Sequence, residues 1–272
     1  MSLTNNNIFS LSAQVTLNSN ARAISTVMQQ LSTGKRINNP SDDVAGLAIS
    51  TRLTTQIRGL NQALRNGNDG ISLIQTADSG ASEIGNMLQR MREVAIDAYS
   101  KTNATDASIV DVDYSALKTQ ITQTAESAQW AGSNLLTSGV YTFQIGANAG
   151  QTIAVTLPDM RINSGSKLSS ILDSQVTDST SASAAQGLLS AALDIVNLER
   201  ANMGAVISRL QFNNDNLLNL SLRIQESRSR IEDTDYAQAS TELARRLIIQ
   251  QAAQAMLAQS NQMPALVLQL IR

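Results

Sequence analysis

Apolar residues recur every seven positions through the last third of the chain, without interruption over six heptads. Only a long helix that packs along a partner keeps this period. Since an α-helix rises about 1.5 Å per residue, a helix of roughly 40 residues extends about 60 Å and needs partners along its length. Half of the row three positions further on is polar, which favours a helical bundle over a two-stranded coiled coil. The apolar row consists of Leu189, Val196, Met203, Leu210, Leu217, Ile224 and Ile231.

A second long helical pattern occupies residues 42–99. Ser41 is a candidate N-cap, and Asp42 and Asp43 follow it at the positive end of the helix dipole. The pattern contains five glycines between residues 59 and 85, each of which costs about 1 kcal/mol relative to alanine in a helix. Close approach of a neighbouring helix and a tolerated weakness explain these glycines equally well. The predicted packing row of this helix includes Leu53, Leu60, Ile74 and Leu88.

Three more helices and a hairpin complete the pattern. Large residues alternate on both sides of the glycine-containing stretch 146–150, which predicts a β-hairpin near 140–158. The Ser/Thr-rich stretch 160–185 shows no strong period. We expect a surface loop with one short helix there, and deletion of residues 162–180 should leave assembly intact. Helical spacing predicts helices over 3–34, 106–129 and 235–270, in addition to the heptad helix, which extends over 182–231.

The order of these elements is nearly mirror-symmetric. A helical segment stands at each end, long helices lie inside, and the hairpin marks the middle. The expected fold class is therefore mainly α: a long antiparallel helical coiled-coil bundle with one β-hairpin, in which the N- and C-terminal helices pair. Two terminal helices cannot bury all their apolar rows alone, so exposed stripes remain for other copies of the chain.

Composition argues against most catalytic chemistry. The 272 residues include no Cys and no His, which removes thiolate nucleophiles, the commonest metal ligand and the commonest general base. Aspartate-only chemistry remains open, but no catalytic, cofactor-binding or metal site is visible. The formal net charge of −2 is too near neutral to indicate a nucleic-acid binder. No apolar run approaches the roughly 20 residues of a membrane span, so we expect no membrane insertion. The chain also shows no cleavable signal peptide, which indicates the cytoplasm unless export leaves no cleavable mark.

Several motifs, collinear and spread over nearly the whole chain, are similar to those of one protein family. They are LSTGKRIN (31–38), SDDVAGLAI (41–49), RNGNDGIS (65–72), LQRMREVA (88–95), FQIGAN (143–148), SRIEDTDYA (229–237) and LAQSNQ (257–262). By these motifs the chain resembles bacterial flagellin, the subunit of the flagellar filament.

The resemblance implies two layers. Residues 1–41 and 232–272 would supply the two halves of an inner coiled-coil domain that lines the filament channel. Residues 42–231 would form an outer helical-bundle domain. A short variable loop near 159–181 would stand in place of the large outer domains of many flagellins. The residues implied in inner-layer assembly are Leu17, Ile24, Leu31, Leu243, Leu247 and Leu257.

The resemblance also implies a function, a route and partners. Such a protein self-assembles into the extracellular filament used for swimming, after export in an unfolded state through the flagellar type III channel. An export chaperone would hold its C-terminal segment, and filament cap and hook-junction proteins would contact the subunit; no cofactor is implied. Arg90, Val94 and Gln120 align with positions that Toll-like receptor 5 reads in many flagellins. Val94 stands where Leu is usual and Gln120 where Glu is usual.

Three other functions stay open at this point. A hook–filament junction protein has similar ends, although the hairpin motif and the segment 230–236 favour flagellin. An enzyme or secreted effector on a helical scaffold is disfavoured by the absence of His and Cys. A receptor-type signalling coiled coil would need a membrane span that the sequence does not show.

Overall fold

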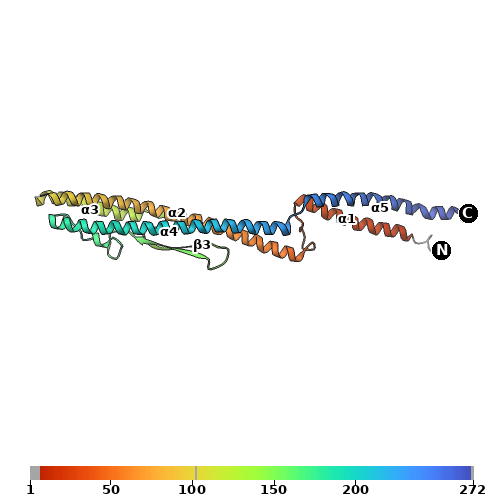
Figure 1. Ribbon diagram of the computed structural model, residues 1–272, viewed down its shortest axis with the longest axis horizontal. Coiled ribbons are helices and arrows are strands. Elements are labelled where there is room, and N and C mark those ends of the chain that lie inside the picture. Colours follow the sequence, from red (N-terminus) through yellow and green to blue (C-terminus); the bar gives the residue numbers. More distant parts are fainter. Residues whose placement is uncertain (1–6, 102, 271–272) are drawn as a thin grey trace. The chain divides into compact units, whose positions relative to one another are not determined.

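The computed structural model describes residues 7–101 and 103–270, most of which are helical (Figure 1). The helices are α1 (Ile8–Thr33), α2 (Val44–Ser100), α3 (Ala104–Ser127), α4 (Ser179–Glu232) and α5 (Tyr236–Leu270). Between α3 and α4 along the chain come β1 (Gln129–Trp130), β2 (Ser133–Asn134), β3 (Thr137–Gln144), β4 (Thr152–Asp159) and the 3-10 helix η1 (Ser169–Ile171). The predicted fold class, mainly α with one hairpin and paired terminal helices, is confirmed.

Contacts divide the chain into two compact units. Unit 1 consists of residues 1–55 and 223–272, and unit 2 of residues 56–222. Unit 1 holds the terminal helices α1 and α5, and unit 2 holds α3, the strands and most of α2 and α4. The boundaries predicted near 41 and 231 both fall inside unit 1.

The core of unit 2 is built from the inward faces of α2, α3 and α4. Burial of an apolar side chain of Leu or Ile size contributes about 1.5–3 kcal/mol, so these long rows stabilise the unit strongly. The predicted rows lie partly in unit 1, where Leu53, Ile224 and Ile231 are half-buried. The predicted residues buried in unit 2 are Leu60, Ile74 and Leu88 on α2, and Leu189, Val196, Met203, Leu210 and Leu217 on α4.

Glycines in α2 allow neighbouring elements to approach its backbone closely. A Cβ at Gly67 would lie 2.2 Å from Asn214 Oδ1, which is too short for any contact between these atoms. A Cβ at Gly70 would lie 3.2 Å from the Phe143 ring and 3.3 Å from Leu210 Cδ1. At Gly85 the nearest atom would be 3.8 Å away, an ordinary contact. Close approach therefore explains the first two glycines, and tolerated weakness explains Gly85.

The predicted hairpin is present as the antiparallel pair β3–β4, in which Phe143 pairs with Ile153 and Tyr141 with Val155. Burial alternates along β4, because every second side chain faces the helices. Two amides fix the tip of the hairpin on the helices. Asn66 Nδ2 of α2 donates to the Gln144 carbonyl at 3.0 Å, and Asn213 Nδ2 of α4 donates to the Ile145 carbonyl at 3.3 Å.

The segment between β4 and α4 is part of the core, so the expectation of a surface loop is wrong for its apolar residues. The predicted short helix is present as η1, but apolar side chains of η1 and of the turns around it are buried in the core. These side chains follow no regular period, which explains why the sequence pattern did not reveal them. The buried residues are Met160, Ile162, Leu168, Ile171 and Val176.

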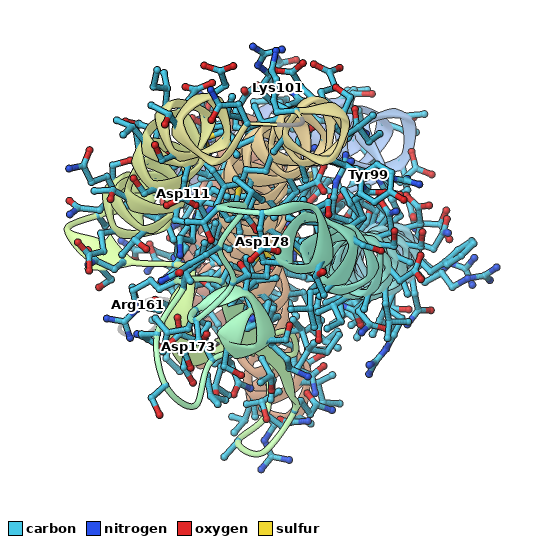
Figure 2. The ribbon with its side chains drawn as sticks, turned by 90° about the vertical axis from the view of Figure 1, so that its left-hand side faces the viewer. Tyr99, Lys101, Asp111, Arg161, Asp173 and Asp178 are labelled. Atoms are coloured by element: carbon cyan, nitrogen blue, oxygen red, sulfur yellow. The ribbon has the colours of Figure 1, made fainter. Side chains whose placement is uncertain are left out.

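Polar contacts from α3 hold this segment in place. Lys118 Nζ donates to the carbonyls of Leu172 and Ser174 at 3.2 and 2.8 Å. The buried Tyr114 hydroxyl lies 2.7 Å from Ser174 Oγ, and burial raises the pKa of Tyr114 above its ordinary value. Asp111 Oδ1 accepts from the backbone N–H of Val176 at 2.8 Å. Figure 2 views this end of unit 2, with Asp178 near the middle and Asp111 to its upper left.

The terminal helices α1 and α5 of unit 1 form an antiparallel pair, and hydrogen bonds join the two helices at both ends. Asn7 Nδ2 donates to the Ser260 carbonyl and Asn20 Nδ2 to the Arg246 carbonyl, both at 2.8 Å. At the other end of the pair, Tyr236 donates to the Leu31 carbonyl at 2.9 Å. Contacts that run from 7 with 260 to 31 with 236 define the antiparallel direction.

The connector after α1 differs from its predicted capping. Gly34 ends α1 in the left-handed region, with φ +71°, as a glycine C-cap commonly does. The side chain of Asp43, rather than that of Ser41, accepts from the backbone N–H of Gly46 at 2.7 Å. Asp42 Oδ2 instead accepts from the backbone N–H groups of Asn38 and Asn39. The predicted Ser41 N-cap is therefore wrong, because the helix begins two residues later than expected.

Candidate assembly surfaces

The terminal pair places most of the predicted inner-layer residues in its own seam. Ile24 is buried, and Leu247, 43% exposed, points outward. The half-buried ones are Leu17, Leu31, Leu243 and Leu257. The seam is thin, because a helix pair without further layers covers only one side of each helix.

The opposite side of α1 carries an apolar stripe that faces no described residue of the seam. Ile8, Leu11 and Val15 follow a helical spacing of three and four, and about 60% of each is exposed, as the values 63%, 58% and 62% show. At about 100° per residue, this stripe lies on the side of α1 away from Asn20 and Ile24. Full burial of each such side chain is worth about 1.5–3 kcal/mol, so the stripe favours a further partner.

The outward side of α5 is also suited to burial. Ile248 and Met256 are largely exposed there. Residues 247–270 contain no charged residue, and neither do residues 2–21 at the other end of the chain. A partner that covers these helices therefore desolvates few ionic groups, which would otherwise oppose burial.

Charged groups of unit 1 concentrate instead at the connector. Arg36 Nη2 donates to the Ile231 carbonyl at 2.8 Å and lies 3.3 Å from Asp43 Oδ2. The backbone N–H of Gly46 and the Arg36 guanidinium hold the pKa of the Asp43 carboxyl below its ordinary value. Lys35 Nζ pairs with Glu232 Oε1 at 2.5 Å. These contacts tie the two chain segments of the connector together.

One more charged cluster lies on α5. Arg245 and Arg246 both donate to Glu242, at 2.9 and 2.7 Å, and lower the pKa of Glu242 to about 2. The three side chains use each other as partners, so α5 presents little unpaired charge at this turn.

The described residues show neither a membrane-spanning helix nor a metal-binding cluster. None of their helices is long and apolar enough to cross a membrane, and they contain no cluster of three acidic side chains suited to a metal ion.

Two protein-family models match this chain. The model of the bacterial flagellin N-terminal helical region matches residues 4–142, and that of the C-terminal helical region matches residues 186–271. The chain is 38% identical over 271 residues to a flagellin of Halalkalibacterium halodurans, covering 98% of this chain and 99% of that relative. The chain belongs to the bacterial flagellin family.

Other flagellins agree over the same length. A flagellin of Bacillus subtilis is 38% identical over 302 residues, and the flagellar filament 33 kDa core protein of Treponema phagedenis is 34% identical over 287 residues. Each alignment covers 98% of this chain and 99% of the relative. The crystal structure of Bacillus cereus flagellin is 28% identical and matches with a TM-score of 0.48, covering 56% of this chain and 88% of that one.

The three residues predicted by resemblance to contact a receptor differ in exposure. Arg90 is exposed on α2, where its ion pair with Glu93 at 2.8 Å raises the pKa of Arg90. Gln120 is exposed on α3. Val94 is only 5% exposed, so its side chain packs in the core of unit 2. Arg90 and Gln120 can contact a partner directly, whereas Val94 supports the surface from beneath.

Two surface features of this flagellin were missed at the sequence level. The stripe of Ile8, Leu11 and Val15 has a visible signal, since its spacing of three and four is helical. Phe212 is the most exposed large apolar side chain among the described residues, at 75%. Its sequence signal is weaker, because a single aromatic residue on a long helix is equally compatible with the core.

Proposed function

We propose that this flagellin family member is the structural subunit of a bacterial flagellar filament, which self-assembles for swimming motility and is not an enzyme. The single observation that carries the proposal is the terminal pair α1–α5, with exposed apolar stripes and almost no charge. Such a surface is unfavourable on a free monomer and favourable in a polymer. The family match over both terminal regions supports the same conclusion.

We propose two layers for the assembled subunit. Residues 1–41 and 232–272 form an inner layer around the filament channel, and residues 42–231 form an outer layer with the hairpin. The exposed stripes of α1 and α5 support the inner position, since many copies can cover both helices there. The residues with a proposed role in this layer remain Leu17, Ile24, Leu31, Leu243, Leu247 and Leu257.

Export and partners complete the proposal. The subunit leaves the cell unfolded through the flagellar type III channel and works outside the cell. A thin helix pair supports this route, because its helices depend on packing and unfold readily without partners. A flagellin chaperone holds the C-terminal segment, where Ile248 and Met256 offer apolar contacts. The filament cap and hook-junction proteins contact the subunit at the ends of the filament.

Electron microscopy of the purified full chain tests the polymer directly. After heating, cooling and seeding, we expect long filaments of uniform diameter in negative stain. Replacement of Leu11 and Val15 by Asp should prevent their formation, and Gln89→Asp on the exposed surface of α2 serves as the matched control. A wild-type chain that stays monomeric under all seeding conditions would contradict the proposal and favour the junction-protein alternative.

We also propose recognition by Toll-like receptor 5 through Arg90 and Gln120. Both side chains are exposed and lie on neighbouring helices of one core, which supports a shared contact surface. A reporter assay for the receptor should show a weaker response to Arg90→Ala than to the wild-type monomer. Val94→Leu should raise the response, and Gln89→Ala should leave it unchanged. Equal responses of all four proteins would exclude this recognition.

A further inference from the structure

One face of α4 carries arginines at heptad spacing. Arg209, Arg223 and Arg230 occupy positions of one seven-residue row, with Asn216 between the first two, and all three arginines are exposed. None of them forms an ion pair with another residue in the described part of the chain. Residues 209–230 hold four Arg and two acidic residues, a net charge of +2. We name the row Arg209–Arg223–Arg230 the arginine face.

Exposed apolar area accompanies this charge. Phe212 lies one turn from Arg209 and has 75% of its surface exposed. Leu220 lies one turn before Arg223 and is 42% exposed. Aromatic and arginine side chains together are typical of the energetically dominant part of protein–protein contacts.

The outward face of α3 has the opposite character. Tyr114 and Ile121 turn one side of this helix into the core. The other side exposes Ile109 and Val112, each by 67%, with Asp106 and Asp113 beside them. Residues 104–113 include three Asp and no Lys or Arg, a net charge of −3. We name the set Asp106, Ile109, Val112 and Asp113 the acidic face.

Spacing and charge make the two faces complementary. Asp106 and Asp113 are seven residues apart, as are Arg223 and Arg230, so each pair spans about 10.5 Å along its helix. Neither Asp106 nor Asp113 forms an ion pair within 4 Å with a described residue, although Asp113 interacts weakly with Arg90. Both faces thus offer charges that lack a close opposite partner, next to apolar side chains that remain in water.

Arg209 and the acidic face both belong to unit 2, and they cannot meet within one chain. The contact of Asp111 with Val176 fixes the first half of α3 beside the start of α4. Arg209 lies 30 residues beyond Ser179 on α4, which corresponds to about 45 Å along a continuous helix. An acidic face that pairs with Arg209 must therefore belong to another molecule.

We propose that the arginine face of one copy docks on the acidic face of a second copy. This inference rests on the proposed function and names the residues of one contact between subunits. Two different patches meet in it, so the contact is heterologous, and repetition of it generates an open polymer rather than a closed dimer. Complementary charges select the partner and the register, and the apolar side chains supply the burial.

Charge reversal in the full chain tests the contact. The first variant carries Arg223→Glu with Arg230→Glu, and the second carries Asp106→Arg with Asp113→Arg. Each variant alone places like charges opposite each other. We expect each to raise the critical concentration for elongation of wild-type seeds by at least about tenfold, because like charges at an interface are strongly unfavourable. Sedimentation and light scattering measure that concentration.

An equimolar mixture of the two variants separates this contact from a general loss of solubility or folding. In alternating order, the reversed arginine face of the first variant meets the reversed acidic face of the second, and the remaining faces pair as in the wild type. We therefore expect the mixture to assemble at nearly the wild-type concentration. Far-UV circular dichroism and urea unfolding should show that each variant is folded as a monomer.

A matched control reverses two exposed charges outside both faces, Arg92→Glu with Asp194→Arg, and should assemble as the wild type does. The inference is overturned if either variant alone assembles normally, if the mixture stays as defective as its components, or if the control variant is equally defective. These outcomes leave the proposed function intact as long as the wild-type chain forms filaments. Failure of the wild type itself would count against the proposed function instead.

Discussion

The two units of the chain bury their residues to very different extents. In unit 1, α1 has 26 residues and buries only Asn20 and Ile24. In unit 2, one connected core joins α2, α3, α4, the hairpin and the segment before α4. The difference teaches that unit 2 has an extensive core of its own, whereas α1 of unit 1 leaves most of its side chains exposed or half-buried. The predictions below are ordered by their effect on the free energy of unfolding of the monomer.

The largest effect is expected from a charge in the core of unit 2. Leu210→Asp should lower the free energy of unfolding by at least about 4 kcal/mol, since it removes a fully buried side chain and buries a carboxylate without a partner. Urea unfolding followed by circular dichroism measures this loss. Leu220→Asp on the same helix, at a site 42% exposed, is the control and should cost much less. Equal losses at both positions would remove the distinction between core and surface of α4.

The segment before α4 gives the second prediction. Ile171→Ala should cost about 2–4 kcal/mol, because Ile171 is fully buried and its removal leaves a cavity. Its neighbour Leu172 is 38% exposed, and Leu172→Ala should cost less than about 1 kcal/mol. Thermal unfolding of the two variants measures both losses of stability. If both behave alike, the segment does not belong to the core. Deletion of residues 162–180 should likewise destabilise unit 2, although the sequence alone predicts that assembly tolerates this deletion.

For the apolar stripe of α1 we expect the reverse: a substitution should hardly change the stability of unit 2 but should prevent assembly. Val15→Asp should change the free energy of unfolding of unit 2 by less than about 0.5 kcal/mol, because Val15 is 62% exposed and lies in the other unit. The same substitution should nevertheless abolish seeded filament growth. Arg22→Asp tests whether any acidic substitution on α1 abolishes filament growth. Normal filaments from Val15→Asp would show that the stripe is not an assembly surface.

Acid should affect the terminal pair only slightly. Arg245 and Arg246 lower the pKa of Glu242 from 4.5 to about 2 in the folded chain. A folded pKa below the unfolded value means that this stabilisation is present above pH 4.5 and is lost as the pH falls toward 2. Hydrogen exchange of α5 should increase across this window in the wild type. Glu242→Gln should show a smaller increase in the hydrogen exchange of α5 than the wild type. Glu83→Gln on α2 should show the same increase as the wild type.

The sequence predicted the parts of the fold in which one residue type recurs at a fixed interval. The row from Leu189 to Leu217 and the alternation along β4 both follow a simple period, and both are buried as their periods require. The terminal helices were paired correctly from the symmetry of the element order. Filament assembly could be inferred only through motifs similar to those of flagellin.

Other features depend on contacts that no period encodes. Ile171 and Val176 enter the core through turns, and Tyr114 and Lys118 become informative only once Ser174 lies beside them. The glycines of α2 stayed ambiguous until Asn214 and Phe143 were placed against them. The two complementary faces on α3 and α4 were not predicted either, since their significance depends on which side of each helix the core covers.

The scarcity of charge in the terminal helices has a thermodynamic consequence. Association of apolar surfaces weakens on cooling, because its driving force near room temperature is largely entropic. Attraction between exposed charges is instead screened within about 8 Å at physiological ionic strength and changes little with modest cooling. We expect contacts made by α1 and α5 to loosen in the cold, and those between the arginine and acidic faces to loosen in concentrated salt. The two kinds of contact would then let temperature and ionic strength act on separate parts of one polymer.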